Sequence, residues 1–174
     1  MNRRGMGIGQ VFIFIISAIT FALIMIFGYQ SISQFIESGE DVAFVQFKTT
    51  LENDIKKIYT EYGSVRIGDF NLPSEYEQIC FVNMDADYNS GSNSELCEKD
   101  PVACSVWEDS EGYDSTEENV FLRPVAPVKI KVYEIEIDKS DGYDKDYLCI
   151  PIANGGFNLY MEGKGDHTAL AIPN

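Results

Sequence analysis

Three oxygen-bearing side chains alternate in the segment DADYN and suggest a metal ligand set. Asp85, Asp87 and Asn89 stand at every second position, and alternate oxygen side chains on a tight loop suit calcium. The EF-hand loop also needs Gly at its sixth position and Glu at its twelfth, where this chain has Ser90 and Leu96. We therefore favour a solvated polar loop, keep calcium as the alternative, and expect no other cofactor.

The four cysteines, Cys80, Cys97, Cys104 and Cys149, all follow the apolar N-terminal segment. An even number in a non-cytosolic domain favours two disulfides over free thiols. No CxxC pair occurs, whereas zinc sites need tighter ligand pairs. Cys97 and Cys104 are close in sequence and suit a local link, whereas Cys80 and Cys149 each lie in a predicted strand. We predict the pairs Cys80–Cys149 and Cys97–Cys104.

Catalytic chemistry has little support in the sequence. His167 is the single histidine and stands beside Asp166, but a general base needs a nucleophile within reach. The chain has no G-x-S-x-G elbow and no G-x-x-x-x-G-K-[ST] phosphate loop. We predict no catalytic residues and expect that the protein is not an enzyme.

The charge balance argues against nucleic-acid binding. The chain has 28 acidic and 13 basic residues, a formal net charge of -15, and the imbalance lies almost wholly after the apolar segment. Such a surface repels phosphates. A strongly acidic surface instead favours solubility.

An uncharged apolar run extends from Ile8 to Tyr29. As a helix it is about 33 Å long, enough to cross a bilayer core. No A-x-A-like cleavage site follows it, so we expect the run to be retained rather than removed as a secretory signal. Ala22 and Gly28 are small residues that would let neighbouring helices approach closely.

The charges that flank the apolar run predict its orientation in a membrane. Arg3 and Arg4 precede it, whereas Glu37, Glu40 and Asp41 follow it. The positive-inside rule then places the N-terminus in the cytoplasm and the rest of the chain outside. The predicted disulfides independently indicate that the part of the chain after the run lies outside the cytoplasm, because disulfides persist in oxidising compartments.

The N-terminal segment resembles the class III signal sequence of type IV pilins and archaeal pilin-like proteins. In that family a short basic leader ends in glycine, and a peptidase cuts before an apolar run that stays in the mature protein. The matching elements are the basic pair and the candidate cleavage glycines: Arg3, Arg4, Gly5, Gly7 and Gly9. Cleavage after Gly9 would leave Gln10 first, and no glutamate stands five positions after any of these glycines, unlike in bacterial pilins. The resemblance implies a homo-oligomer joined through the N-terminal helices in a filament core, with the run in the membrane before assembly.

A second helix is predicted over residues 37–63. Its apolar residues recur every three or four positions: Phe44, Phe47, Leu51, Ile55, Ile58 and Tyr62. Ser38 with Asp41 forms a capping box, so the helix would restart there with a kink at Gly39. Gly63 suits the position that ends a helix. The stripe packs on its own domain or also binds another subunit.

Residues 64–174 predict an antiparallel β domain outside the membrane. Five expected strands cover residues 77–84, 128–137, 146–152, 156–162 and 168–172. Asp141-Gly142 and Asn154-Gly155 are hairpin turn signals. The stretch 85–118 is polar and long for a loop without structure, and Trp107 within it is expected to cover part of the core. Residues 1–9 would be a leader or cytoplasmic tail, and residues 10–36 the hydrophobic helix.

The expected fold is therefore α+β, a long N-terminal hydrophobic helix followed by an antiparallel β-sheet domain, as in pilins. The favoured function is a structural subunit of a type IV pilus-like filament at the cell surface. The alternative is a single-pass membrane protein whose acidic outer domain binds a partner or belongs to a membrane complex. An outer-surface enzyme is the least favoured class.

Overall fold

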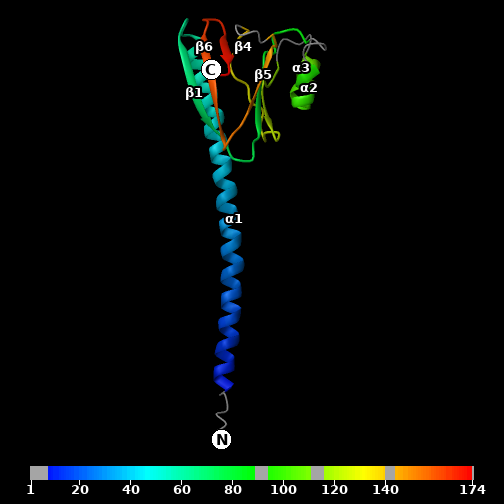
Figure 1. Cartoon of the computed structure of the whole chain (residues 1–174). Coiled ribbons are helices and arrows are strands. Elements are labelled where there is room, and N and C mark those ends of the chain that lie inside the picture. Colours follow the sequence, from blue (N-terminus) through cyan, green and yellow to red (C-terminus); the bar gives the residue numbers. More distant parts are fainter. Residues whose placement is uncertain (1–7, 89–93, 111–115, 140–143, 174) are drawn as a thin grey trace. The chain divides into compact units, whose positions relative to one another are not determined.

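The structure, a computed structural model, describes residues 8–88, 94–110, 116–139 and 144–173 (Figure 1). The chain divides into two compact units, Met1–Val42 and Ala43–Asn174. We describe each unit by itself. The order of elements is an N-terminal helix followed by strands and two short helices, an α+β fold rich in antiparallel pairs.

Helix α1 extends from Ile8 to Tyr59. Its window from Val11 to Ser31 has a mean hydropathy of 2.8, and none of it is buried. By length and composition this window could cross a membrane. Within it, the Thr20 hydroxyl donates to the carbonyl of Ile16, so this polar group is satisfied by the helix backbone.

The predicted restart at Ser38 is wrong, because Ser38 and Gly39 lie inside α1. A single glycine costs a helix only about 1 kcal/mol, too little to end one whose neighbours favour it. The helix stops at Tyr59, and Gly63 adopts a positive φ of 75° in the turn that follows. Tyr62 therefore falls after the helix and is 82% exposed, not part of the buried stripe.

The described residues of the second unit include seven strands, which form two sheets. The four-stranded sheet has the order β1-β6-β7-β4 and the three-stranded sheet has the order β3-β2-β5. The strands are β1 (Val65–Asn71), β2 (Gln78–Val82), β3 (Val120–Arg123), β4 (Ile135–Ile137), β5 (Tyr147–Pro151), β6 (Gly156–Gly163) and β7 (Thr168–Ala171). All described pairs are antiparallel except β4 with β7, so the domain is antiparallel as predicted apart from this one parallel pair.

The strand predicted over residues 128–137 is largely wrong. Only Ile135–Ile137 forms strand β4, and Ile130 makes an isolated bridge with Val120. The buried side chain of Asn119 accepts from the Val132 amide at 2.8 Å and donates to its carbonyl at 3.1 Å. The Asn119 side chain thus bonds both backbone groups of Val132, as a neighbouring strand would. These two bonds hold the segment around Val132 to the sheet, although that segment does not form a strand.

The main core lies between α1 and both sheets. The α1 residues Phe44, Phe47, Leu51, Ile55 and Ile58 are each 5% exposed or less, as their spacing predicts. They pack with buried side chains of both sheets in one cluster. Residues 44–58 of α1 therefore form part of the core of the second unit.

The polar stretch after Asp85 contains two helices that the sequence analysis missed, α2 (Ser94–Lys99) and α3 (Pro101–Ser110). They pack on a second buried cluster built around Leu96 and Trp107, which is 1% exposed. Apolar positions spaced three or four apart in this stretch, such as Ala103 and Trp107, were the available signal. Because α2 and α3 lie within it, the stretch 85–118 is not a long loop without secondary structure.

The turn at Asn154-Gly155 has the geometry that its sequence predicts. Both residues have positive φ, 54° and 75°, as a two-residue type I′ turn requires. Ala153 and Gly156 exchange backbone hydrogen bonds of 3.0 and 3.1 Å across it. The strands on either side then enter different sheets. The other predicted turn, Asp141-Gly142, lies outside the described residues.

Candidate functional site

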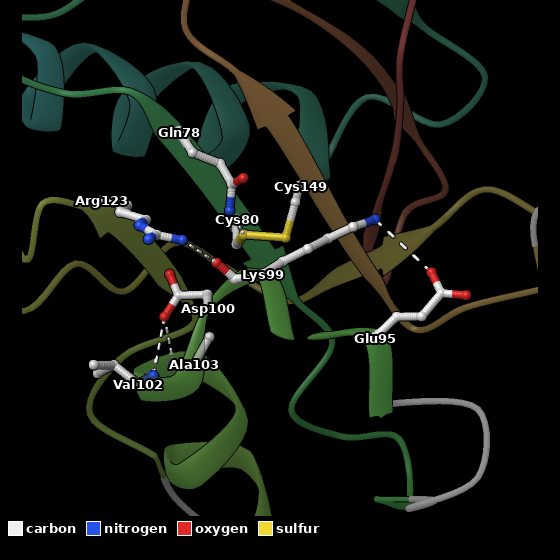
Figure 2. Close-up of a disulfide and its surroundings, with 9 residues drawn as sticks. All are labelled: Gln78, Cys80, Glu95, Lys99, Asp100, Val102, Ala103, Arg123 and Cys149. Atoms are coloured by element: carbon white, nitrogen blue, oxygen red, sulfur yellow. Dashed lines mark hydrogen bonds and ion pairs between the residues drawn. A yellow bond between two sulfur atoms is a disulfide. The ribbon is translucent and has the colours of Figure 1, made fainter. Parts of the chain in front are cut away.

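The disulfide between Cys80 and Cys149 joins strands β2 and β5 (Figure 2). The two residues are direct partners in the strand register, as their predicted strand placement requires. The side-chain amide of Gln78 donates to the Cys80 sulfur at 3.1 Å, and Cys80 is fully buried. The bond is thus part of the core of the outer domain.

The second disulfide joins Cys97 in α2 to Cys104 in α3, the other predicted pair. The Tyr88 hydroxyl lies 3.7 and 3.6 Å from its two sulfur atoms. Tyr88 also packs edge-on against Trp107, whose indole nitrogen donates to the Ala86 carbonyl at 3.1 Å. The two helices are therefore fixed to the segment that precedes them by both covalent and aromatic contacts.

Asp100 directly precedes helix α3 and caps it. Its carboxylate accepts from the amides of Val102 and Ala103 at 3.1 and 3.0 Å (Figure 2), as an N-cap residue does. Pro101 follows at the first helical position, where its lack of an amide hydrogen is harmless. Arg123 of β3 donates to the Lys99 carbonyl at 3.0 Å, which ties the turn between α2 and α3 to the sheet.

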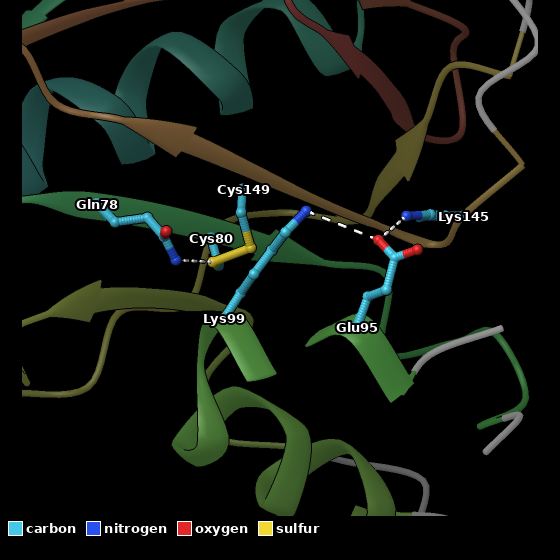
Figure 3. Close-up of polar contacts among 6 residues, drawn as sticks. All are labelled: Gln78, Cys80, Glu95, Lys99, Lys145 and Cys149. Atoms are coloured by element: carbon cyan, nitrogen blue, oxygen red, sulfur yellow. Dashed lines mark hydrogen bonds and ion pairs between the residues drawn. A yellow bond between two sulfur atoms is a disulfide. The ribbon is translucent and has the colours of Figure 1, made fainter. Parts of the chain in front are cut away.

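Glu95 of α2 forms a charged contact with Lys145, which lies two residues before strand β5 (Figure 3). Its carboxylate accepts a hydrogen bond from Lys145 and lies 3.9 Å from Lys99. The hydrogen bond from Lys145 lowers the pKa of Glu95 and raises the pKa of Lys145. Burial raises the pKa of Tyr147, whose ring lies under both lysines. This surface is a structural contact whose charges are matched within the chain.

The structure describes two of the three predicted calcium ligands. Asp85 and Asp87 are exposed, and Asn89 lies outside the described residues. The Asp85 amide donates to the Asn83 side chain at 3.1 Å, a turn that needs no ion. Within the described part of the chain, no cluster of three or more His, Cys, Asp or Glu side chains could hold a metal.

His167 lies between two carboxylates. Its Nδ1 is 2.7 Å from Asp166 Oδ1, and its Nε2 is 3.0 Å from Glu136 Oε2. Both ring nitrogens are therefore directed at carboxylates of the parallel β4–β7 region. This arrangement aims neither nitrogen at a serine or cysteine nucleophile.

A cavity of about 250 Å³ lies beside strand β3, lined largely by apolar side chains of β3 and of residues 125–128, with Glu118 and Lys129 at its border. Val125 and Val128 are exposed there. No pattern in the sequence predicts this cavity.

The largest apolar surface in the first unit is that of α1. Fourteen large apolar side chains between Val11 and Tyr29 are each at least 47% exposed. Gly28, in this segment, has no other atom within 4 Å of where a Cβ would stand, so its surface is open to a neighbouring helix. Of the candidate cleavage glycines, Gly5 and Gly7 lie outside the described residues, and Gly9 is in the first turn of α1.

Comparisons with known proteins assign no class to this arrangement. No protein-family model matches the chain, and no curated protein or solved structure is significantly similar to it.

Proposed function

We propose that this protein is a structural subunit of a type IV pilus-like extracellular filament, with the apolar part of α1 in the filament core. The observation that carries the proposal is the uncovered surface of the window from Val11 to Ser31. The basic, glycine-containing leader and the folded, disulfide-bonded domain that follows the helix support it. The acidic outer domain would face solvent, where like charges limit lateral clumping.

Exposing the apolar side chains of this helix to water would cost too much free energy, so lipid or other protein must cover them. Burying a large apolar side chain is worth about 1.5 to 3 kcal/mol, so the fourteen exposed side chains of this segment represent roughly 20 to 40 kcal/mol. A water-exposed monomer is excluded by that magnitude. Lipid covers the helix before assembly, and the same helix of neighbouring copies covers it in the filament.

The second candidate function is a single-pass membrane protein with an acidic outer domain that binds a partner. The same apolar window and the same disulfides favour it. It differs in keeping its leader and in leaving α1 in lipid permanently. An intact mass measured on protein from native cells separates the two, because a filament subunit would lack the residues before Met6, Ile8 or Gln10.

Replacing Ala22 with Arg tests filament formation. A buried charge in a helical bundle is costly unless it is paired, so this variant should give no filaments in electron micrographs of sheared surface material. Ala22→Ser is the matched control, because serine keeps the position small, and it should still assemble. Both disulfides should remain intact in each variant. Wild-type protein that stays in the membrane fraction as a monomer, with its leader uncut, would refute the filament proposal.

A further inference from the structure

Strand β3 is an edge of the three-stranded sheet β3-β2-β5, and its two sides bind different parts of the chain. Val82 at the end of β2 donates to the Asn119 carbonyl at 3.0 Å, and bonded residues alternate along an antiparallel ladder. The odd-numbered residues of β3 therefore direct their backbone groups toward β2. Val120 and Leu122 direct theirs away from the sheet.

The outward backbone groups of Val120 and Leu122 differ in what they bind. Val120 donates to the Ile130 carbonyl at 3.2 Å and forms an isolated antiparallel bridge with that residue. A ladder continued from this bridge would place Val128 opposite Leu122. Within the described ranges, however, no group bonds the Leu122 amide or carbonyl. Leu122 is only 3% exposed, so a buried residue has two backbone groups that the chain itself does not pair.

The cavity beside β3 lies where this ladder stops. Its lining includes Leu122 and Val128, together with Val102 of α3 and Val125. Buried backbone groups in native proteins are nearly always paired, with protein, a ligand or ordered water. Two opposite bonded residues of an antiparallel pair exchange both of their hydrogen bonds. The group that complements Leu122 therefore carries one N–H and one C=O, arranged as in a single extended residue, and the apolar lining favours an apolar side chain on it.

The size and the ends of the cavity limit the ligand to a small molecule. An apolar cavity of about 150 Å³ is large enough for benzene, and this one has about 250 Å³. A longer peptide strand does not fit along β3, because Ile130 already occupies the place opposite Val120 and Pro124 follows the strand. Val125 and Val128 are exposed, so a small molecule can enter from solvent on their side.

The charges at the border of the cavity favour a neutral ligand. Lys129 is the one cation among the described lining residues, and its Nζ lies 2.7 Å from Glu117 Oε2. Glu118, which also lines the cavity, would repel a carboxylate, and the net charge of -15 acts in the same direction. A cationic ligand would gain little from Glu118, because that side chain is not buried and such pairs are weak.

We propose that this cavity binds a small neutral ligand of one class, an N-acylated amide of a branched-chain amino acid. The ligand carbonyl accepts from the Leu122 amide, the ligand N–H donates to the Leu122 carbonyl, and the branched side chain packs on Val102 and Val125. The ligand thus takes the place that Val128 would hold in a continued ladder. These residues all belong to the unit Ala43–Asn174, so the inference does not rest on the filament proposal.

NMR titration of the full-length protein in lipid nanodiscs with N-acetylvaline amide tests the site. The Leu122 amide signal should shift saturably, with a Kd in the millimolar range expected of a ligand with about eleven non-hydrogen atoms. The Phe121 amide, which is directed toward β2, should shift much less. The ester analogue, in which oxygen replaces the N–H of the valine, should bind about tenfold more weakly, because the Leu122 carbonyl loses its donor. A capped pentapeptide with valine between two pairs of serines should also bind more weakly.

Val128→Phe fills the cavity and should abolish the saturable shift while thermal unfolding stays cooperative. Ile172→Phe is the matched control, because Ile172 is 54% exposed and lies outside the cavity lining, and it should bind like wild type. The inference is overturned if wild type shows no saturable shift, as a cavity that holds only water would. Equal affinity for the amide and the ester, tighter binding of the pentapeptide, or unchanged binding by Val128→Phe would also overturn it. The outcome of the Ala22→Arg test has no bearing on this result, because Ala22 belongs to the other unit.

Discussion

At the scale of single residues, three buried polar side chains of the second unit form hydrogen bonds to the chain's own backbone. Asp100, Asn119 and Thr168 are the buried polar residues of the described structure, each 5% exposed or less. Asp100 caps α3, Asn119 holds Val132, and Thr168 donates to the Ile55 carbonyl at 3.4 Å. Because each has a partner in the fold, their loss should change stability and leave association unaffected.

Asp100→Ala should destabilise the outer domain by about 1 to 2 kcal/mol, because two amides at the start of α3 lose their acceptor. Chemical denaturation in detergent micelles measures the change. Asp100→Asn is the control, since its amide oxygen can still accept and it should lose much less. Equal losses in the two variants would show that the carboxylate charge, and not the cap, is what matters.

The contact between Glu95 and Lys145 should make stability depend on pH. The pKa of Glu95 is lowered in the folded protein by the hydrogen bond from Lys145, so folding favours the ionised carboxylate. This contribution is present above the unfolded pKa near 4.5 and is lost as the pH falls through the folded pKa. Lys145→Met should therefore lower the melting temperature at pH 7 and have less effect at pH 3. Lys57→Met, at an exposed helical position, should show no such pH-dependent difference.

At the scale of elements, the end of α1 packs tightly against β6. A Cβ at Gly163 would stand 2.2 Å from the Ile58 carbonyl oxygen and 2.4 Å from that of Glu61. Both atoms are backbone, so neither can rotate away. The close approach of helix and strand at this point therefore depends on the absence of a side chain.

Gly163→Ala should destabilise the outer domain by about 1 to 3 kcal/mol, the usual cost of overpacking. Gly39→Ala is the opposite case, because nothing lies within 4 Å of its Cβ position and it lies inside α1. Alanine there should stabilise the helix by about 0.5 to 1 kcal/mol. Thermal unfolding of both variants in detergent micelles should show a lower melting temperature for Gly163→Ala and a higher one for Gly39→Ala. A destabilised Gly39→Ala would show that α1 is interrupted at this residue.

At the scale of the whole molecule, the chain combines an apolar helix that needs a cover with an outer domain fastened by two disulfides. The loop closed by Cys80 and Cys149 spans 69 residues, and the loop closed by Cys97 and Cys104 spans seven. The larger loop includes α2, α3 and β3. Its crosslink therefore constrains most of the outer domain, whereas the shorter one constrains only the pair of short helices.

Removing the Cys80–Cys149 bond by a double alanine replacement should cost about 4 kcal/mol, and removing Cys97–Cys104 about 2 kcal/mol, in the chain-entropy model. Chemical denaturation of the two variants measures the difference. Non-reducing peptide mapping of the wild type comes first. A Cys80–Cys97 peptide in that map would mean that the pairing is wrong and that the comparison has no basis.

The features that depend on local pattern can be predicted from the sequence alone. Apolar residues three or four apart can share only one face of a helix, so Phe47, Leu51 and Ile55 had to be buried together. The length of the apolar run is likewise a local property. The strand containing Cys80, the strand containing Cys149 and the turn at Asn154-Gly155 were predicted for the same reason, since β-branched runs and turn residues act over a few positions.

Contacts between distant segments determine which edge strands form, which face each strand buries and which strand it pairs with. In β1 the apolar Val65 and Ile67 alternate as in a core strand, yet they point outward while Phe70 is buried. The reason is that Phe70 packs on Phe47 of α1 and on Phe157 of β6, and these contacts set the register of the whole strand. The parallel pairing of β4 with β7 and the shortening of β4 beside Asn119 depend in the same way on hydrogen bonds between distant segments. Pairing of that kind is a property of the folded chain, because neither partner's sequence specifies the other.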